Sequence, residues 1–220
     1  MAANLEDIRQ HLMELATRIG LSEDDLPSFG SPRGDGRPAV EVSGSVLSLV
    51  ESERGHEYSR YSTKDPDEFA YAVLAQSIAL NGASWLGQIN IPYVDRRLLG
   101  FTRECHLLGC LDSRWRDRRR ADLMQEIATH PILVKLSETD RGLFESFRPV
   151  SRFADAFADS GQGDTGFSDA FVMAVLVERG LRDRGVSVED AAEMAKWAHG
   201  FLIAQWGPSG FPHSRGVKAD

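Results

Sequence analysis

The sequence predicts an α+β fold that is mainly helical, with a small antiparallel β-sheet near the N-terminus. Apolar residues recur at three- and four-residue spacing through most of the chain, which is typical of amphipathic helices. Between residues 39 and 63 this spacing gives way to short β-branched and alternating runs separated by glycine turns, which is typical of strands. Apolar residues make up 42% of the 220 residues and charged residues 26%, so the chain can bury a sizeable core.

The N-terminal part contains one helix and the sheet. Residues 5–19 have an amphipathic pattern that ends at Gly20, a residue suited to the left-handed conformation after a helix. Residues 22–38 are polar and rich in glycine and proline, so we expect an exposed loop. Residues 39–42, 46–50 and 56–63 then predict two or three strands, which need helices packed on them to be stable.

The helix start near residue 66 has three independent signals. Asp65 is suited to the N-cap, Pro66 to the first helical position, and Glu68 to the position three residues after the cap. This helix is expected to end near Gly87, and further helices are expected at about 94–111, 117–129, 142–158, 168–184 and 188–206. We divide the chain into an α+β region, residues 1–140, and a helical region, residues 141–220, which are either two domains or parts of one, with residues 160–166 as a candidate linker.

The net charge and the cysteine content indicate the cellular compartment of the protein and the kind of partner it can bind. The net charge of −8 disfavours general affinity for nucleic acid or anionic membrane and favours a basic partner. Cys105 and Cys110 form no disulfide framework, and we expect small core residues in a reducing compartment. The N-terminus does not resemble a signal peptide, and no apolar run has the length and composition of a membrane span. We therefore expect a cytoplasmic protein.

The sequence contains no motif that predicts a catalytic, cofactor or metal site. The six histidines are scattered, without metal-ligand spacing. The glycines of residues 161–166 match a dinucleotide-binding spacing, but a helical pattern precedes them where that motif needs a strand. A metal site formed by Cys105, His106 and Cys110, or an enzyme using His106 or His199 with nearby carboxylates, stays open as an alternative.

A second alternative is a nucleic-acid-associated regulator. Five arginines lie within residues 114–120, between Arg114 and Arg120, in an otherwise acidic chain. The competing interpretation is an exposed helical segment whose arginines pair with Asp112, Asp117 and Asp122. The net negative charge of the chain favours this second interpretation.

One pattern extends over residues 49–132. It consists of residues 50–57, 60–63, 65–71 and 95–97, of Trp115, and of a closing helix that ends at residues 127–132. This pattern resembles immunity protein 63, a family of bacterial toxin-immunity proteins. The resemblance implies a cytoplasmic antidote that neutralises a cognate polymorphic toxin by direct binding and uses no cofactor. An acidic surface would suit a basic toxin such as a nuclease domain, because complementary charge speeds association.

If the chain binds a toxin, tight inhibition needs a buried anchor as well as charge, and exposed aromatic residues are the best anchors. The candidate anchors are Tyr58, Tyr61, Trp115, Trp206 and Phe211, and structural packing is the alternative role for each of them. The predicted partner-binding set is Tyr58, Arg60, Tyr61, Asp67, Glu68, Arg96, Arg97 and Trp115. The alternative role for the charged members of this set, together with Thr63 and Asp65, is to attach the sheet to the first long helix by capping and ion pairing.

Overall fold

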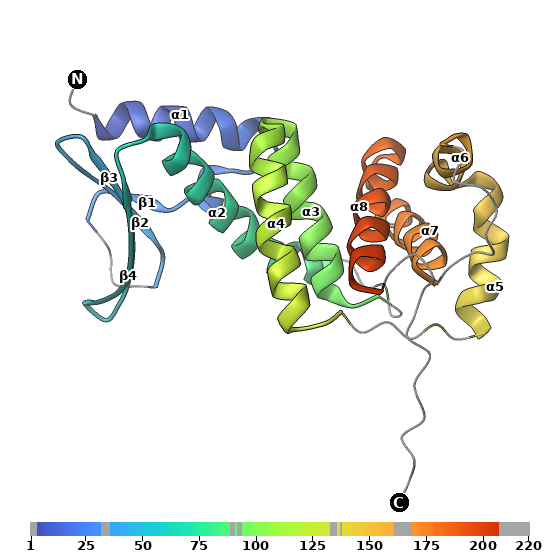
Figure 1. The fold of residues 1–220 in the computed structure, drawn as a ribbon. Coiled ribbons are helices and arrows are strands. Elements are labelled where there is room, and N and C mark those ends of the chain that lie inside the picture. Colours follow the sequence, from blue (N-terminus) through green and yellow to red (C-terminus); the bar gives the residue numbers. More distant parts are fainter. Residues whose placement is uncertain are drawn as a thin grey trace, which may run out of the picture. The chain divides into compact units, whose positions relative to one another are not determined.

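The computed structural model confirms the α+β class. It describes residues 4–31, 36–88, 91, 94–132, 136, 138–160 and 169–206. Within these residues the chain has eight α-helices and a four-stranded mixed sheet near the N-terminus (Figure 1). The chain divides into two compact units: unit 1 consists of Met1–Ala83 and Leu107–Arg116, and unit 2 of Ser84–His106 and Asp117–Asp220.

The sheet belongs to unit 1 and has the strand order β1-β2-β3-β4. The strands β2 (Ala39–Ser43), β3 (Val46–Glu53) and β4 (His56–Thr63) form the predicted antiparallel meander. Both connecting turns contain a glycine with positive φ, Gly44 and Gly55, a conformation that glycine adopts without steric cost. Because β3 is central, four consecutive residues from Leu47 to Val50 are buried.

The segment predicted as an exposed loop, residues 22–38, contains an additional strand. Strand β1 (Ser28–Phe29) pairs with β2 in parallel, and a short 3₁₀-helix, η1 (Glu23–Asp25), precedes it. Leu26 is buried, and the Arg37 guanidinium donates to its carbonyl oxygen at 2.6 Å. The prediction was wrong here because a two-residue strand has no periodicity that a sequence pattern can reveal.

Two helices pack on one side of the sheet and form the core of unit 1. Helix α1 (Leu5–Arg18) is capped by Asn4, whose side chain accepts a hydrogen bond from the Glu6 amide. Helix α2 (Pro66–Gln88) begins after Asp65 as predicted. Figure 1 shows both helices on the same side of the strands. The core combines residues of α1, α2 and the facing side of β2 and β3: Leu12, Ala16, Val40, Leu47, Leu49, Phe69, Leu74 and Ile78.

Helices α3 (Arg96–Leu111) and α4 (Ser113–Thr129) follow, each with residues in both units. Helix α4 starts four residues earlier than the predicted residue 117. The reason is Asp112, whose carboxylate accepts from the Arg114 amide at 2.7 Å and so acts as the helix cap. The arginine-rich segment 114–120 is therefore helical from its first residue.

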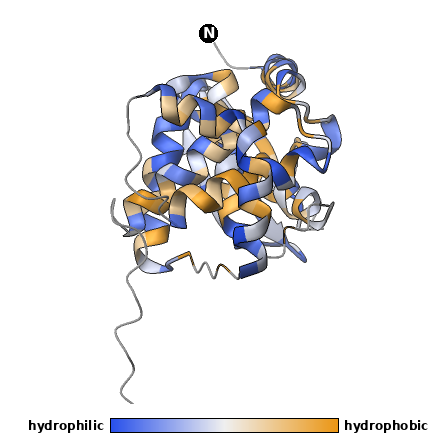
Figure 2. Cartoon of the chain, turned by 90° about the vertical axis from the view of Figure 1, so that its right-hand side faces the viewer, coloured by the Kyte–Doolittle hydropathy of each residue, from blue (hydrophilic) through white to orange (hydrophobic). Residues whose placement is uncertain are grey.

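Unit 2 is built around a buried helix. Every residue of α7 (Asp169–Arg182) from Ala170 to Leu181 is buried except Arg179, and α8 (Val188–Trp206) packs along it. A helix that is apolar on all sides belongs in a core. Figure 2, coloured by hydropathy, shows hydrophobic and hydrophilic residues side by side along individual helices.

The helix expected at 142–158 is two helices. Helix α5 (Glu138–Phe147) ends at a 3₁₀ turn, η2 (Arg148–Val150), and α6 (Arg152–Asp159) begins after Ser151, whose hydroxyl accepts from the Ala154 amide. Pro149 explains the break, because proline in a helix interior has no N–H to donate. Residues 161–166 of the predicted linker and the residues after 206 lie outside the described part of the chain.

None of the helices in the described ranges is long and apolar enough to span a bilayer. The proposed separation of residues 1–140 from residues 141–220 stays a prediction.

Candidate protein-binding site

The most exposed element of unit 1 is strand β4. It forms one edge of the sheet, and among the described strands it pairs with β3 alone. Every residue of β4 is exposed except Thr63, which is half-buried. The sequence signal for this exposure is the composition of the strand, His-Glu-Tyr-Ser-Arg-Tyr-Ser-Thr, which has no aliphatic residue.

Two tyrosines project from this edge. The pairing with β3 is regular from Leu47–Thr63 to Glu51–Ser59 and then shifts, so that Ser52 faces Glu57 and Tyr58 is the additional residue of a bulge. A bulge re-aims side chains and is common at sheet edges. The exposed fractions are 63% for Tyr58 and 37% for Tyr61, and both rank among the few large exposed hydrophobic side chains of the described residues.

Arg60 lies between the tyrosines in the sequence, on the face of the sheet opposite to Tyr61, and is held by two carboxylates. Its guanidinium bonds to Glu57 at 2.7 and 2.8 Å and to Glu41 on β2 at 3.0 Å. The hydrogen bonds from Arg60 lower the pKa of Glu57, and those to Glu57 and Glu41 raise the pKa of Arg60. Arg60 is among the contact residues predicted from the sequence, whereas its pairing with Glu41 depends on strand register and its pairing with Glu57 on the bulge at Tyr58. Arg60 therefore presents a fixed guanidinium in a strand surface that carries both signs of charge.

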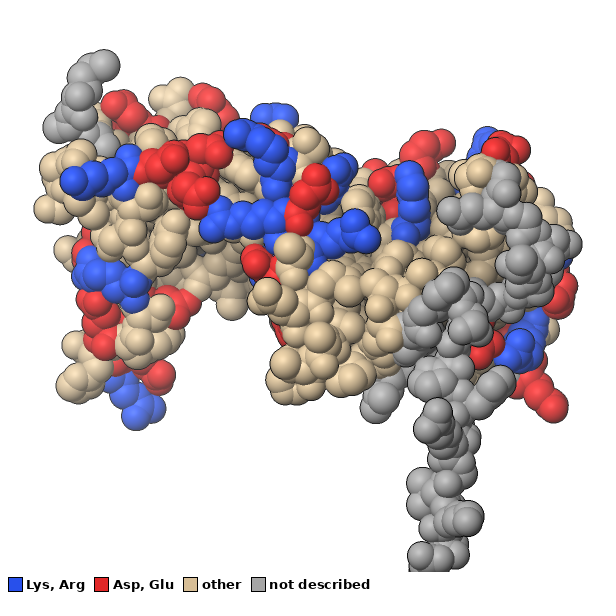
Figure 3. Space-filling model, in the orientation of Figure 1, with Lys and Arg blue, Asp and Glu red and all other residues tan. Residues whose placement is uncertain are grey.

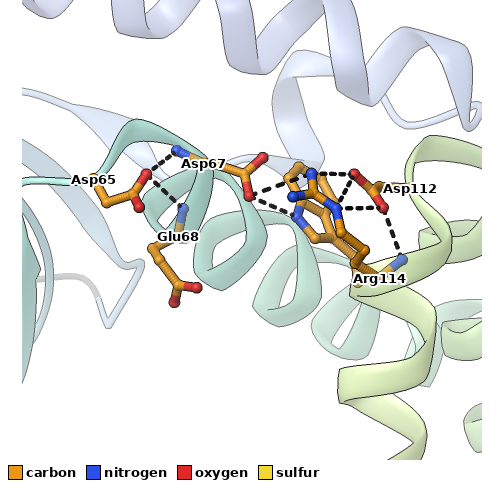
Figure 4. A network of polar contacts seen from close by, with 6 residues as sticks. Asp65, Asp67, Glu68, Asp112 and Arg114 are labelled. Carbon is orange, nitrogen blue, oxygen red and sulfur yellow. Dashed lines mark hydrogen bonds and ion pairs between the residues drawn. The ribbon is translucent and has the colours of Figure 1, made fainter.

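Asp65, Asp67 and Glu68 follow β4 directly and form the start of α2 (Figure 4). The Asp65 carboxylate accepts from the Asp67 amide at 2.9 Å and from the Glu68 amide at 3.5 Å, and the Thr63 hydroxyl accepts from the Asp65 amide. This is the capping arrangement that the sequence predicts, with negative charge at the positive end of the helix dipole.

The Asp67 carboxylate points toward the start of α4. It accepts from the Trp115 indole N–H at 3.4 Å and lies 3.8 Å from the Arg114 guanidinium, which also binds Asp112 at 2.6 Å (Figure 4). Trp115 is only 7% exposed and packs edge-on against Tyr71. Most of its surface is thus already occupied within unit 1, whereas Tyr58 is mostly exposed and Tyr61 is exposed over about a third of its surface.

The two remaining charged candidates, Arg96 and Arg97, belong to unit 2. Arg97 binds Asp95 and donates to the carbonyl oxygens of His130 and Pro131, both at 2.9 Å, which satisfies acceptors after the C-terminus of α4. Arg96 is exposed at the start of α3. The side chains of Trp206 and Phe211 are outside the described residues.

The arginines of residues 114–120 are engaged with other side chains. Arg114 binds Asp112, Arg119 binds the mostly buried Glu104 at 2.6 Å, and Arg120 lies over the ring of Trp197. Figure 3 shows acidic side chains beside the basic ones on the face it displays. A nucleic-acid site needs several uncompensated cations, and these pairings reduce the charge available to phosphate.

The candidate metal and catalytic residues lie in separate environments. Cys105 is fully buried, whereas Cys110 is exposed. The His106 Nε2 lies 3.0 Å from an Asp190 oxygen, and His199 packs against Phe153 and Phe157, where burial lowers its pKa. In the part of the chain that the structure describes, no three histidine, cysteine or carboxylate side chains are grouped so that they could hold a metal ion.

Unit 1 carries most of the net charge of the protein. It contains fifteen Asp and Glu residues and nine Lys and Arg residues, so its net charge is −6 of the total −8. The exposed strand β4 is thus part of the more acidic unit. Such a field speeds the approach of a positively charged partner and slows that of a negatively charged one.

A central segment of the chain is similar to known proteins of one functional class, the immunity proteins, which implies toxin neutralisation. The family is immunity protein 63, and its model matches residues 44–125, a segment that includes all of β4 and α2. This confirms the resemblance for that segment. Comparisons with curated proteins and with solved structures give no match.

Proposed function

We propose that the chain is a bacterial immunity protein that neutralises a cognate polymorphic toxin in the cytoplasm by binding it directly. The observation that carries the proposal is the match of residues 44–125 to the immunity protein 63 family. Members of such families typically act without enzymatic turnover. Inhibition then depends on a surface that binds one toxin tightly enough to block it.

The surface that best fits this role is the exposed strand β4 of unit 1. Interface energy concentrates in a few aromatic and arginine residues surrounded by polar contacts that exclude water. Tyr58, Arg60 and Tyr61 lie within four residues of this strand, with Arg60 and Tyr61 on opposite faces of the sheet, and Glu57 and Glu41 hold Arg60 in place. A basic toxin domain, such as a nuclease, suits the net charge of −6 on this unit.

The other predicted contact residues would contribute to the proposed interface in different ways. Asp67 and Glu68 border β4 and add negative charge to the same unit, while Asp67 also holds Trp115 in place. Trp115 then supports the surface from within. Arg96 and Arg97 remain proposed contacts of unit 2, where Arg97 also caps α4.

The first experiment is genetic. Reading frames adjacent to the gene for this chain are expressed in bacteria with and without it, and growth is measured. We expect one neighbour to arrest growth and this chain to restore it. If every toxic neighbour remains toxic in its presence, or if no neighbour is toxic, the proposed function is wrong.

The second experiment places the interaction on β4. The double variant Tyr58→Ala/Tyr61→Ala removes two hot-spot candidates, and we expect it to weaken toxin binding by about 2 kcal/mol or more, roughly 30-fold. The matched control is Leu80→Ala, which truncates an exposed apolar side chain of unit 1 that lies on α2 (58% exposed). Calorimetric titration should show parent affinity for the control and loss for the double variant. Equal affinity of the two variants would remove β4 from the interface.

A further inference from the structure

We propose that β4 binds the toxin through its main chain, by pairing with an extended segment of the toxin that continues the sheet. This inference rests on the proposed function and specifies its contact. A strand at a sheet edge has one row of N–H and C=O groups without a strand partner, and adding a strand is a recurrent mode of recognition. The occupant that we assign is a strand carrying lysine or arginine on the surface of the toxin.

The geometry of β4 leaves its edge open over a useful length. The strand has eight residues, and its pairing with β3 is continuous over five positions, Ser59 to Thr63. The bulge at Tyr58 lies toward the N-terminal end and leaves this run regular. Proteins usually protect exposed edges with proline, charged side chains, bulges or very short strands. Strand β4 has neither proline nor lysine, its bulge lies outside the regular run, and the charge of Arg60 within that run is paired with Glu57 and Glu41.

The side chains of β4 also suit the contact. Its central residues are Tyr58, Ser59, Arg60, Tyr61 and Ser62, which are the residue types that antibodies use most in their binding loops. Tyrosine contributes a large contact area at low conformational entropy, and serine forms adaptable hydrogen bonds. The main-chain row would fix the register of the incoming strand, and the tyrosines would supply the specificity.

The charge of unit 1 distinguishes between two occupants of the same edge. A second copy of this chain would bring another unit of net charge −6 to the edge, and like charges oppose that association. A strand from a basic toxin brings the opposite charge. We therefore assign the edge to the toxin, and self-association becomes an outcome of the test.

The test uses the toxic neighbour found in the growth assay, carried as a catalytically inactive variant, together with the full chain. Amide hydrogen exchange is measured for the chain alone and in the complex. We expect the exchange of alternate amides of β4 to slow at least tenfold in the complex, because each would donate to the added strand. A complex that forms while residues 56–63 exchange at the same rate as in the free chain would overturn the inference and leave the proposed function intact.

A pair of proline variants tests the same contact independently. Successive residues of a strand point their N–H groups to opposite edges, so one of Ser59 and Ser62 donates toward β3 and the other toward the open edge. The variants are Ser59→Pro and Ser62→Pro, with Ser59→Ala and Ser62→Ala as matched controls for the loss of each hydroxyl. Ser62 needs this control because its hydroxyl bonds to Ser48 at 2.9 Å.

We expect one proline variant to lower the melting temperature and the other to keep it while losing at least tenfold in toxin affinity. Parent affinity in the thermally intact proline variant would overturn the inference. Light scattering of the free chain provides the last outcome. A concentration-dependent dimer that the same proline variant dissociates would assign the edge to a second copy and overturn the toxin assignment. If no neighbour is toxic, the proposed function fails at the growth assay, before this test begins.

Discussion

Glu178 provides the clearest test of how unit 2 is stabilised. This carboxylate lies fully buried in α7 and accepts three hydrogen bonds from the start of α6: from the Ser151 hydroxyl, the Arg152 amide at 2.9 Å and the Phe153 amide at 3.0 Å. The Arg182 guanidinium lies 3.5 Å away. In Glu178→Ala the donors lose their acceptor in a buried site, and Arg182 loses its carboxylate. Removing one member of such a buried group costs about 3–5 kcal/mol.

The expected loss of stability is large enough to be measured by thermal denaturation. In a chain of this size, each kcal/mol shifts the melting temperature by about 2–4 °C, so Glu178→Ala should melt roughly 10 °C below the parent. Glu178→Gln keeps one acceptor oxygen and should lie between the two. The matched control is Glu193→Ala, since the Glu193 carboxylate on α8 is solvent-exposed and its ion pair with Lys196 is worth little. If Glu178→Ala melted within about 2 °C of the parent, the desolvation cost of the carboxylate would equal its hydrogen-bond gain, and our reasoning would be refuted.

Three further predictions concern single residues. Gly180→Ala should destabilise the protein by about 1–2 kcal/mol, because the new methyl would lie 2.4 Å from the Ile91 Cδ1. Gly200→Ala has open space around the new methyl and should stabilise α8 by up to about 1 kcal/mol. Urea denaturation of both variants measures these changes in stability, and equal shifts would contradict the prediction. Burial lowers the pKa of His199 below its ordinary 6.5, so the unfolded state takes up a proton first as pH falls, and the stability of the protein declines below about pH 6.5. In thermal melts between pH 7.5 and 5, His199→Leu should lose this part of the pH dependence. If the melting temperature of His199→Leu changed with pH as steeply as that of the parent, His199 would not be the cause. Asp65→Ala should cost about 1 kcal/mol by uncapping α2, and Asp65→Asn much less, as measured by urea denaturation; equal losses would show that the cap is not the cause.

The sequence predicted elements well where several local signals coincide. The start of α2 was predicted correctly because Asp65, Pro66 and Glu68 act within one turn and need no distant partner. The end of α3 at Leu111 was predicted correctly, but the start of α4 was placed four residues late, because Asp112 directly after that end was not recognised as a helix cap. Pro149 was the local signal for the break between α5 and α6, and the periodicity on both sides of it outweighed it.

The candidate site was predictable in part. Tyr58 and Tyr61 were named as candidate exposed aromatic residues from residue type alone, and both side chains are exposed; their contact with a toxin stays a prediction. The position of β4 at the edge and the bulge at Tyr58 depend on register with β3, which a single sequence does not determine. Trp115 was chosen by the same reasoning as the tyrosines, and its burial against Tyr71 depends on tertiary packing.

The division of α2, α3 and α4 between the two units limits how this chain can be cut. The segment that matches the family, residues 44–125, contains β3, β4, α2, α3 and most of α4, but lacks α1 and β2. Without them, Leu47, Leu49, Phe69 and Leu74 would lose much of their cover. Without α7 and α8, the apolar side of α3 and α4 would be uncovered as well. A fragment made to the limits of the family match would therefore aggregate, and the segment that matches the family depends for its solubility on the parts of the chain outside the match.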